Sequence, residues 1–192
     1  LAQYVDFLCA DAHKWLLGPN GIAFMWARRE ALEKLRPAIL GWLAVENREN
    51  WFSYDTNPMP NAERFEPGAR NYLGIAALDA ALKLYEETGA EWIENRVALL
   101  RDYAYRVLTS CGCPILWPPD SAQKSGIISF AAPNGETTRL FRALDDRFTF
   151  SLRKDKTDRD WIRLAAHWEN TKTDLDELCQ AIVKSRGSKV ES

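Results

Sequence analysis

A lysine between an imidazole and an indole is the residue of this sequence best placed for covalent chemistry. Lys14 follows the apolar run 4–10 and stands between His13 and Trp15. Burial disfavours the ammonium form of a lysine, and a partly neutral lysine can attack a carbonyl group to form a Schiff base. A lysine at the end of a strand can also extend its ammonium group into solvent. The residue types alone leave both roles open.

Two further segments carry groups that can bind anions. Gly68 and Ala69 precede a long helical pattern, and a glycine turn that leads into a helix N-terminus suits an anion, although a plain turn with a cap is commoner. Arg163 stands among apolar residues of a predicted strand. An arginine in such a place usually needs an anionic partner, and its planar fork fits a carboxylate. An internal salt bridge or a place on an edge strand would explain Arg163 equally well.

The elements that must position these residues follow from apolar spacing and turn residues. The sequence predicts strands over residues 4–10, 22–27, 125–131, 148–152 and 161–166. It predicts helices over residues 28–36, 72–88, 90–110, 137–147 and 173–185. Asn71 is a plausible N-cap, Gly89 a plausible helix stop, and Thr173 with Asp176 resembles a capping box. The sequence therefore predicts an α/β protein with a boundary near Gly89.

Two segments lack a clear period. Residues 41–67 hold several aromatic side chains, and a stretch of this length without regular structure indicates a functional or interface loop. Trp42 and Trp51 in this loop fit a substrate pocket or a dimer surface, while core packing is the commoner role of such residues. The charged run 153–160 predicts a solvated loop between strands.

Composition narrows the function classes. The 192 residues include 25 Lys and Arg against 27 Asp and Glu, a net charge of −2. This balance gives no basic footprint for nucleic acid, and no apolar run approaches the roughly 20 residues that cross a bilayer. The four cysteines do not form a secreted disulfide framework: Cys111 and Cys113 are too close to staple a loop, and Cys9 and Cys179 lie in apolar settings typical of buried thiols. We therefore expect a cytoplasmic protein without membrane or nucleic-acid partners. Because the sequence starts at Leu1 and opens directly into a strand pattern, we also expect a fragment whose upstream part is absent.

The segment 10–24, which reads Ala-Asp-Ala-His-Lys-Trp-Leu-Leu-Gly-Pro-Asn-Gly-Ile-Ala-Phe, resembles the lysine segment of the class V aminotransferases. These are fold-type I enzymes that use pyridoxal 5′-phosphate, and the similar branch includes isopenicillin N epimerase, selenocysteine lyase and cysteine desulfurase relatives. The resemblance implies that Lys14 carries the cofactor as an internal aldimine and that His13 lies beside the cofactor phosphate. It also implies that residues 1–89 form the end of the large cofactor-binding domain and residues 90–192 the small α+β C-terminal domain.

Two other segments are similar to the same family. Residues 64–74 resemble the turn that reaches the cofactor phosphate of a neighbouring subunit, which assigns Gly68 and Ala69 to phosphate binding. Ala69 replaces a hydroxyl residue that is usual there, so only backbone N–H groups remain for this role. Residues 161–171 resemble the segment in which an arginine binds the substrate α-carboxylate, which assigns that role to Arg163. By the same resemblance His167 and Asn170 are structural.

The resemblance implies a homodimeric, pyridoxal-phosphate-dependent enzyme that acts on an amino acid and needs no metal. Transamination, epimerisation and lyase chemistry share the same early steps, so these residues do not choose among them. Desulfurases of this superfamily carry a cysteine on the loop before the arginine strand, and residues 153–160 contain none, which argues against sulfur transfer through a persulfide. The competing interpretation is a non-catalytic dimerisation or binding remnant of the fold. The eight tryptophans leave an apolar-ligand carrier as a third.

Overall fold

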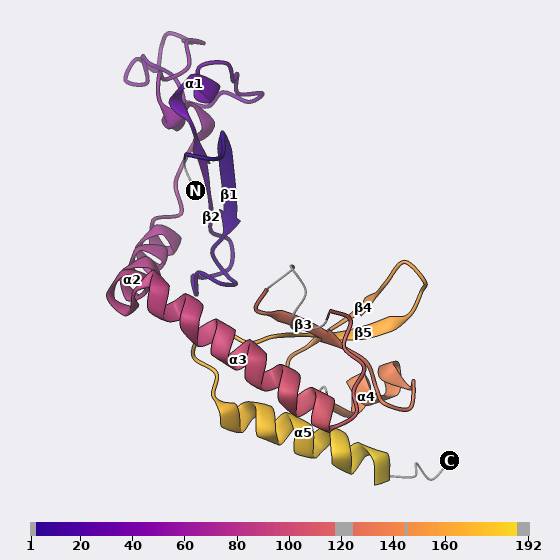
Figure 1. The fold of residues 1–192 in the computed structure, drawn as a ribbon. Helices are drawn as coiled ribbons and strands as arrows, with labels where there is room; N and C mark the ends of the chain where they lie inside the picture. The colour runs from indigo at the N-terminus through magenta and orange to yellow at the C-terminus, as the bar shows by residue number, and fades with distance from the viewer. Residues whose placement is uncertain (1–2, 118–124, 145, 188–192) are drawn as a thin grey trace. The chain divides into compact units, whose positions relative to one another are not determined.

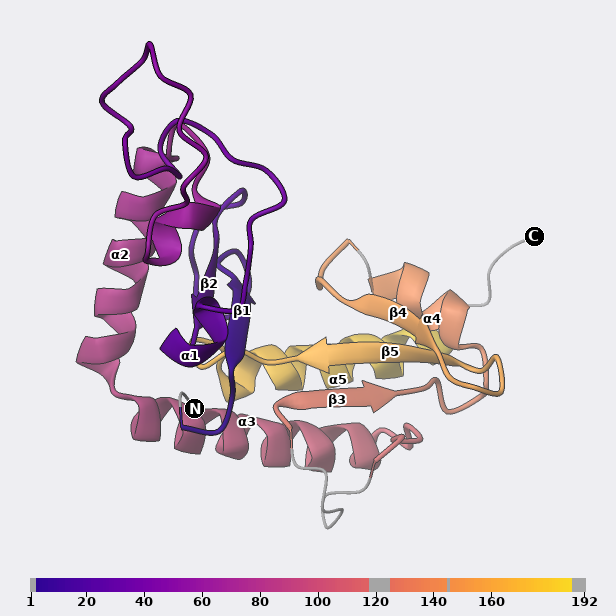
Figure 2. The same cartoon turned by 90° about the horizontal axis from the view of Figure 1, so that it is seen from above.

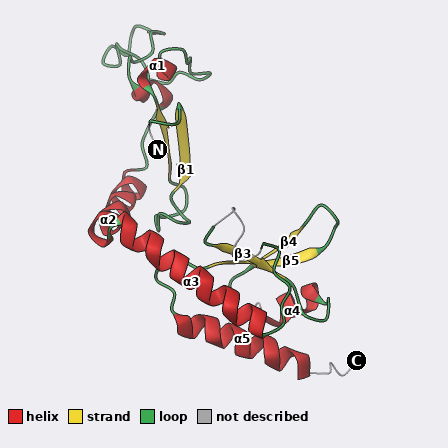
Figure 3. Cartoon of the chain, viewed as in Figure 1, coloured by secondary structure: helices red, strands yellow, loops and turns green. Residues whose placement is uncertain are grey.

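The computed structural model describes residues 3–117, 125–144 and 146–187, and it divides into two compact units between Glu87 and Thr88. Figure 1 gives the order of the elements along the chain, and Figure 3 separates helices, strands and loops. Each unit has its own sheet, one of two strands and one of three.

The first unit begins with an antiparallel pair of strands, β1 (Phe7–Asp11) and β2 (Ala23–Ala27). Their register pairs Phe7 with Ala27 at one end and Asp11 with Ala23 at the other. The intervening residues, which include Lys14, therefore form the connection at the end of a hairpin. The predicted helix over 28–36 is much shorter than expected, because only α1 (Arg29–Leu32) is helical.

The segment 41–67 is a long loop, as the absence of a regular spacing of apolar residues predicts. The short 3-10 helix η1 (Ala62–Phe65) lies near its end. Helix α2 (Tyr72–Thr88) follows. The Asn71 side chain accepts a hydrogen bond from the Gly74 amide at 3.0 Å, which confirms Asn71 as the cap. Gly89 has a φ of +87°, a conformation that favours glycine. This residue separates α2 from α3 (Ala90–Ser110), and both helices have the predicted bounds.

The second unit contains a three-stranded antiparallel sheet in the order β3-β5-β4. Its strands are β3 (Ile127–Phe130), β4 (Ser151–Lys154) and β5 (Asp160–Ala165), and its further helices are α4 (Thr137–Leu144) and α5 (Lys172–Gly187). Figures 1 and 2 show α3 and α5 along one face of this sheet. The core fills that face with side chains from all three strands and helices, among them Leu100, Leu108, Phe130, Leu144, Ile162, Leu178 and Ile182.

Two local expectations are corrected in the second unit. Strand β4 begins three residues later than predicted, because Phe148 and Phe150 stack on each other against the core before the strand starts. The capping box is formed by Thr171 and Asp174, whose amide and side-chain groups bond reciprocally at 2.9 and 3.3 Å, and not by Thr173 with Asp176. This exchange keeps the pKa of Asp174 below its ordinary value, since its carboxylate accepts the Thr171 amide hydrogen.

The cysteines also differ from expectation. Cys111 and Cys179 form a disulfide across 68 residues, so Cys179 is not a free thiol. The pairing links the end of α3 to α5, two helices whose contact sequence spacing alone does not reveal. Cys9 is exposed, whereas Cys113 is buried. Within the described ranges, no helix is long and apolar enough to cross a membrane.

Candidate active site

Lys14 lies in a tight turn that begins where β1 ends. The Leu17 amide bonds to the Lys14 carbonyl at 3.1 Å, and the Gly18 amide bonds to the Ala12 carbonyl at 2.8 Å. The Ala12 amide in turn donates to the Ile22 carbonyl at 3.0 Å, which extends the pairing of the two strands. Ala12 is completely buried, while Lys14 projects outward from the turn. The turn therefore fixes the backbone of the lysine and leaves its side chain accessible.

The Lys14 ammonium group lies 2.6 Å from the carboxylate of Asp11, and both side chains are more than half exposed. The hydrogen bond from Lys14 is the main cause that lowers the pKa of Asp11, and the charges of Lys14 and His13 act in the same direction. His13 is exposed as well. The structure thus brings the two predicted residues of this segment together with a third, Asp11, that sequence reasoning did not assign to the site.

Helix α2 supports the lysine turn through two close approaches. A Cβ atom at Gly18 would lie 2.7 Å from the Ala12 Cβ and 3.4 Å from the Leu78 side chain. A Cβ atom at Gly74 would lie 2.2 Å from the Ile22 side chain. All three distances are at or inside van der Waals contact, so the glycines let the turn and the helix pack directly on each other. The lysine turn is consequently held by packing and not by its own hydrogen bonds alone.

The predicted phosphate turn at Gly68 and Ala69 precedes α2 and is flanked by an ion-pair network. The Arg70 guanidinium bonds to Glu63 at 2.9 Å and also pairs with Glu66. The hydrogen bond that Arg70 donates to Glu63 lowers the pKa of Glu63 and raises the pKa of Arg70. Because Arg70 is engaged by two carboxylates, an anion at Gly68 and Ala69 would meet backbone N–H groups first. Nothing lies within 4 Å of a Cβ placed at Gly68, so the turn has open space in front of it.

Arg64, to which the sequence assigns no role, is buried in this region. Its Nε donates to the Met59 carbonyl at 2.7 Å, and its Nη1 reaches the carbonyls of Leu32 and Leu35 at 3.4 and 3.3 Å. These bonds connect η1 to the segment that follows β2, at Leu32 and Leu35. Only the tertiary contacts reveal this role, because a lone arginine before a phenylalanine is no signal by itself.

Arg163 lies on the central strand of the second sheet, opposite Ser129 on β3 and Ser151 on β4. Its neighbours Ile162 and Leu164 enter the core, so Arg163 belongs to the opposite face of β5. It is half-buried. In the parts of the chain that the structure describes, its guanidinium makes no hydrogen bond or ion pair. An edge-strand position is therefore wrong, and no internal salt bridge accounts for Arg163 among the described residues.

The loop between β4 and β5 is built around Asp155. Its carboxylate accepts hydrogen bonds from the amides of Thr157 and Arg159, from the Thr157 hydroxyl, and from the Trp161 indole at 2.8 Å. These donors, led by the Thr157 hydroxyl, hold the pKa of Asp155 far below its ordinary value. The Arg159 guanidinium stacks over the Trp161 ring at 4.5 Å. The charged run 153–160 was predicted as a loop throughout, but Arg153 and Lys154 end β4 and Asp160 begins β5. Only residues 155–159 form the ordered hairpin loop.

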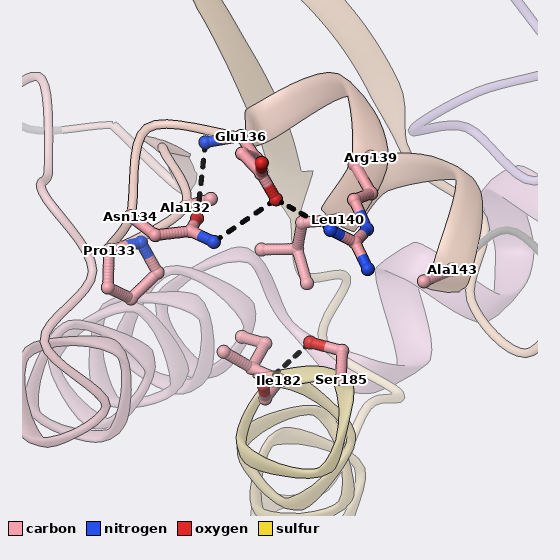
Figure 4. A pocket seen from close by; sticks show the side chains of 9 residues that line it. All are labelled: Ala132, Pro133, Asn134, Glu136, Arg139, Leu140, Ala143, Ile182 and Ser185. Atoms are coloured by element: carbon pink, nitrogen blue, oxygen red, sulfur yellow. Dashed lines mark hydrogen bonds and ion pairs between the residues drawn. The ribbon is translucent and has the colours of Figure 1, made fainter. Parts of the chain in front are cut away.

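A small pocket in the second unit is not a candidate site. Figure 4 shows it between α4 and α5, with Asn134, Glu136 and Arg139 bonded to one another and Ser185 bonded to the Ile182 carbonyl. Its volume is about 80 Å³, well under the roughly 300 Å³ from which small-molecule sites begin. None of the predicted site residues lines it. No group of three or more metal-ligating side chains occurs in the described ranges.

The sequence profile of the family Aminotransferase class-V matches residues 2–154. The chain belongs to the class V aminotransferase family. Isopenicillin N epimerase of Streptomyces clavuligerus is 27% identical over 190 residues, covering 92% of this chain and 46% of the epimerase. A probable cysteine desulfurase of Pyrococcus abyssi is 30% identical over 128 residues, covering 67% of this chain and 31% of the desulfurase. The chain spans about half the length or less of these curated relatives.

Solved structures support the same fold. A lysine-to-alanine variant of C-DES, with glycine covalently linked to its pyridoxal-phosphate cofactor, superposes with a TM-score of 0.79 at 23% identity and covers 93% of this chain and 46% of its own. The fold of this chain is accordingly the α/β fold of the fold-type I enzymes, and pyridoxal 5′-phosphate is the cofactor of the family. An exposed lysine on a rigid turn and an arginine without an internal partner among the described residues are groups that fit this cofactor and an amino-acid carboxylate.

Proposed function

We propose that this chain is part of a pyridoxal-phosphate-dependent enzyme that acts on an amino acid, with Lys14 as the residue that holds the cofactor covalently. The accessible Lys14 side chain on a turn locked by Ala12 and Gly18 carries this proposal. The family membership supplies the context. In this assignment residues 1–89 are the end of the large cofactor-binding domain, and residues 90–192 are the small C-terminal domain.

Arg163 binds the α-carboxylate of the substrate in this proposal. Its position on the central strand restricts the movement of its backbone, and the hairpin around Asp155 fixes the start of the same strand. A guanidinium without an internal carboxylate in the described ranges is free to form a bidentate pair with a ligand carboxylate. Such a pair fixes the orientation of the substrate relative to the reacting bond.

The cofactor, when bound, supplies an electron sink for charge that develops at the substrate Cα. Lys14 would hold this cofactor, and its amine would donate and accept protons at the substrate Cα. Asp11 and His13 lie beside Lys14, and the Asp11 carboxylate forms an ion pair with the Lys14 ammonium group at 2.6 Å. We assign His13, Gly68 and Ala69 to the surroundings of the cofactor phosphate, with the last two acting through backbone N–H groups.

The proposal also has limits on reaction type. The hairpin loop of residues 155–159 contains no cysteine, so we do not propose sulfur transfer through a persulfide on this loop, although a similar protein is named a probable cysteine desulfurase. Transamination, epimerisation and lyase chemistry remain the candidate reactions. We further propose a homodimer in the cytoplasm, with the phosphate turn serving the partner subunit's cofactor.

The test is reductive labelling. The chain is incubated with pyridoxal 5′-phosphate, reduced with borohydride and mapped by peptide mass spectrometry. Lys83 is a matched control, because it is 65% exposed and paired with Asp79 at 2.7 Å, whereas Lys14 is 67% exposed and paired with Asp11 at 2.6 Å. Labelling that follows exposure alone would modify both lysines equally. We expect Lys14 to be labelled at least several-fold more than Lys83.

Equal labelling of the two lysines would contradict the assignment of Lys14 in this chain. That result would favour the alternative, a non-catalytic dimerisation or binding remnant of the fold. A Lys14→Arg variant provides the second control, since it keeps the ion pair with Asp11 but cannot form the reducible adduct. Residual incorporation into this variant measures the background from all other lysines.

A further inference from the structure

A disulfide joins the end of α3 to α5 in the second unit. Cys111 follows the last residue of α3, and Cys179 lies within α5. Their Cα atoms are 6.4 Å apart, within the range of natural disulfides. The Cys111 amide donates to the Val107 carbonyl at 3.1 Å, and the Cys113 amide donates to the Leu108 carbonyl at 3.0 Å. Backbone hydrogen bonds therefore hold the turn that carries Cys111 whether or not the two sulfurs are bonded.

The two sulfurs differ in their access to solvent. Cys111 is 2% exposed and belongs to the core of the second unit. Cys179 is half-buried and lines an open pocket of about 520 Å³ between α3 and α5, two helices that lie side by side in Figures 1 and 2. This volume lies in the range of roughly 300 to 1,000 Å³ that small-molecule sites occupy. A small molecule from solvent therefore meets Cys179 before it meets Cys111.

The fold accommodates the reduced pair as well as the disulfide. The Cys111 Sγ lies 3.9 Å from the Cys179 carbonyl oxygen, and the Cys179 Sγ lies 3.9 Å from the Val107 carbonyl oxygen. After reduction each S–H group is a weak donor with a backbone acceptor already in place. Leu108 of α3 and Leu178 of α5 belong to the same buried core, so the contact between the two helices does not depend on the disulfide alone.

We propose that Cys179 is a site of reversible modification by small thiols of the glutathione type, through which the bond to Cys111 opens and closes. The thiolate of the small molecule attacks the Cys179 Sγ, the S–S bond breaks, and its electron pair leaves on the Cys111 Sγ, which takes a proton from water. A second small thiol attacks the sulfur of the bound one, releases Cys179 as a thiol, and departs in a small-molecule disulfide. Two small thiols are oxidised and the cysteine pair is reduced. None of these residues takes part in the chemistry assigned to Lys14, so the proposal is independent of the proposed function.

Two variants that both lack the disulfide test which sulfur the small thiol reaches. Cys111→Ser keeps Cys179, and Cys179→Ser keeps Cys111. Both carry Cys9→Ser, because Cys9 is an exposed thiol that would react as well. The probe is oxidised glutathione, and the adducts are mapped by peptide mass spectrometry. We expect Cys179 to be modified at least about tenfold faster than Cys111, because the reactivity of a thiol follows its exposure. Equal rates, or a faster reaction at Cys111, would overturn the proposal.

The wild-type chain gives a second measurement that depends on neither variant. The chain is equilibrated in glutathione buffers of increasing reduced fraction, alkylated and mapped. We expect Cys111 and Cys179 to be protected together in oxidising buffers, to be alkylated together in reducing buffers, and to pass through a glutathione adduct on Cys179. An adduct on Cys111 instead, or a pair that does not close again when the reductant is withdrawn, would refute reversible modification at Cys179.

The urea midpoint of unfolding shows whether the bond forms in solution. A cross-link over 68 residues restricts the unfolded chain and so stabilises the folded one. We expect the midpoint of the wild-type chain to fall when reduced glutathione is added, and that of Cys111→Ser to stay the same with and without it. A wild-type midpoint that does not respond to the reductant would contradict the bond on which the proposal depends.

Discussion

The Lys14 ammonium group and the Asp11 carboxylate form an ion pair at 2.6 Å across the first turn after β1. The two residues come from opposite sides of Ala12, which is buried, so the backbone between them is fixed. This relationship makes Asp11 a direct reporter of the state of the Lys14 amine.

The Lys14→Met variant tests this relationship. The hydrogen bond from Lys14 is the largest cause of the lowered pKa of Asp11, so its removal raises that pKa toward the ordinary value of 3.8. A lowered carboxyl pKa contributes stability above the unfolded pKa, and this contribution is lost as the pH falls through the folded value. The measurement is a carboxyl-carbon NMR titration of Asp11. Lys83→Met is the control, and a shift of Asp11 in that variant would contradict a local cause.

The close approach of Gly41 to Pro67 gives a stability prediction for the stretch that carries Gly68. A Cβ atom at Gly41 would lie 1.9 Å from the Pro67 carbonyl oxygen, whereas a Cβ atom at Gly68 would meet nothing within 4 Å. Gly41→Ala must displace backbone, and such overpacking costs about 1 to 3 kcal/mol. Gly68→Ala should change the free energy of unfolding by less than about 0.5 kcal/mol. Urea unfolding of both variants checks this order, and equal values would refute the contact.

The fold was predictable where short-range signals act alone. The cap at Asn71 and the glycine at 89 mark the ends of α2 and α3, and both helices have the predicted bounds. The start of β4 was not predictable in this way. Phe148 and Phe150 read as strand residues, but they stack on each other to reach the core, and only the tertiary packing decides this.

For the candidate site, the sequence could propose individual residues but not the tertiary contacts around them. Lys14, His13 and Arg163 are predicted as site residues from residue type and resemblance, and these roles stay predictions. The structure gives Lys14 an accessible side chain and places Arg163 on a central strand. The role of Asp155 was not found, because its four donors come together only when the hairpin closes. The buried contacts of Arg64 to backbone carbonyls were missed for the same reason.

Arg96 and Arg163, both in the second unit, should differ in how much each contributes to the free energy of unfolding. Arg96 donates to the carbonyls of Trp168 and Asn170 at 3.3 and 2.6 Å. Hydrogen bonds to a charged donor are worth about 1.5 to 3 kcal/mol, so Arg96→Met should lower the free energy of unfolding by that order. Arg163→Met should change it by less than about 0.5 kcal/mol, because no described residue pairs with Arg163. Chemical unfolding of the two variants measures this difference. A large loss of unfolding free energy in Arg163→Met would show that the role of Arg163 is structural.

The bond from the Trp161 indole to Asp155 gives a prediction about pH. The pKa of Asp155 is lowered far below its ordinary value of 3.8, chiefly by the Thr157 hydroxyl and the Trp161 indole. The carboxylate therefore stays charged when the pH falls through 3.8, and the stability that it contributes is lost only in more acidic solution.

We expect the Trp161 indole N–H resonance to keep its position between pH 6 and about pH 4, the ordinary carboxyl range. Slow hydrogen exchange of this proton should persist over the same interval. In Asp155→Ala the indole loses its acceptor at 2.8 Å, so its exchange with solvent should accelerate at every pH. The indole of Trp117, which is exposed, serves as the internal reference for the intrinsic exchange rate. A Trp161 resonance that titrates near pH 4 in the wild-type chain would show that the hairpin does not hold Asp155 in its charged form.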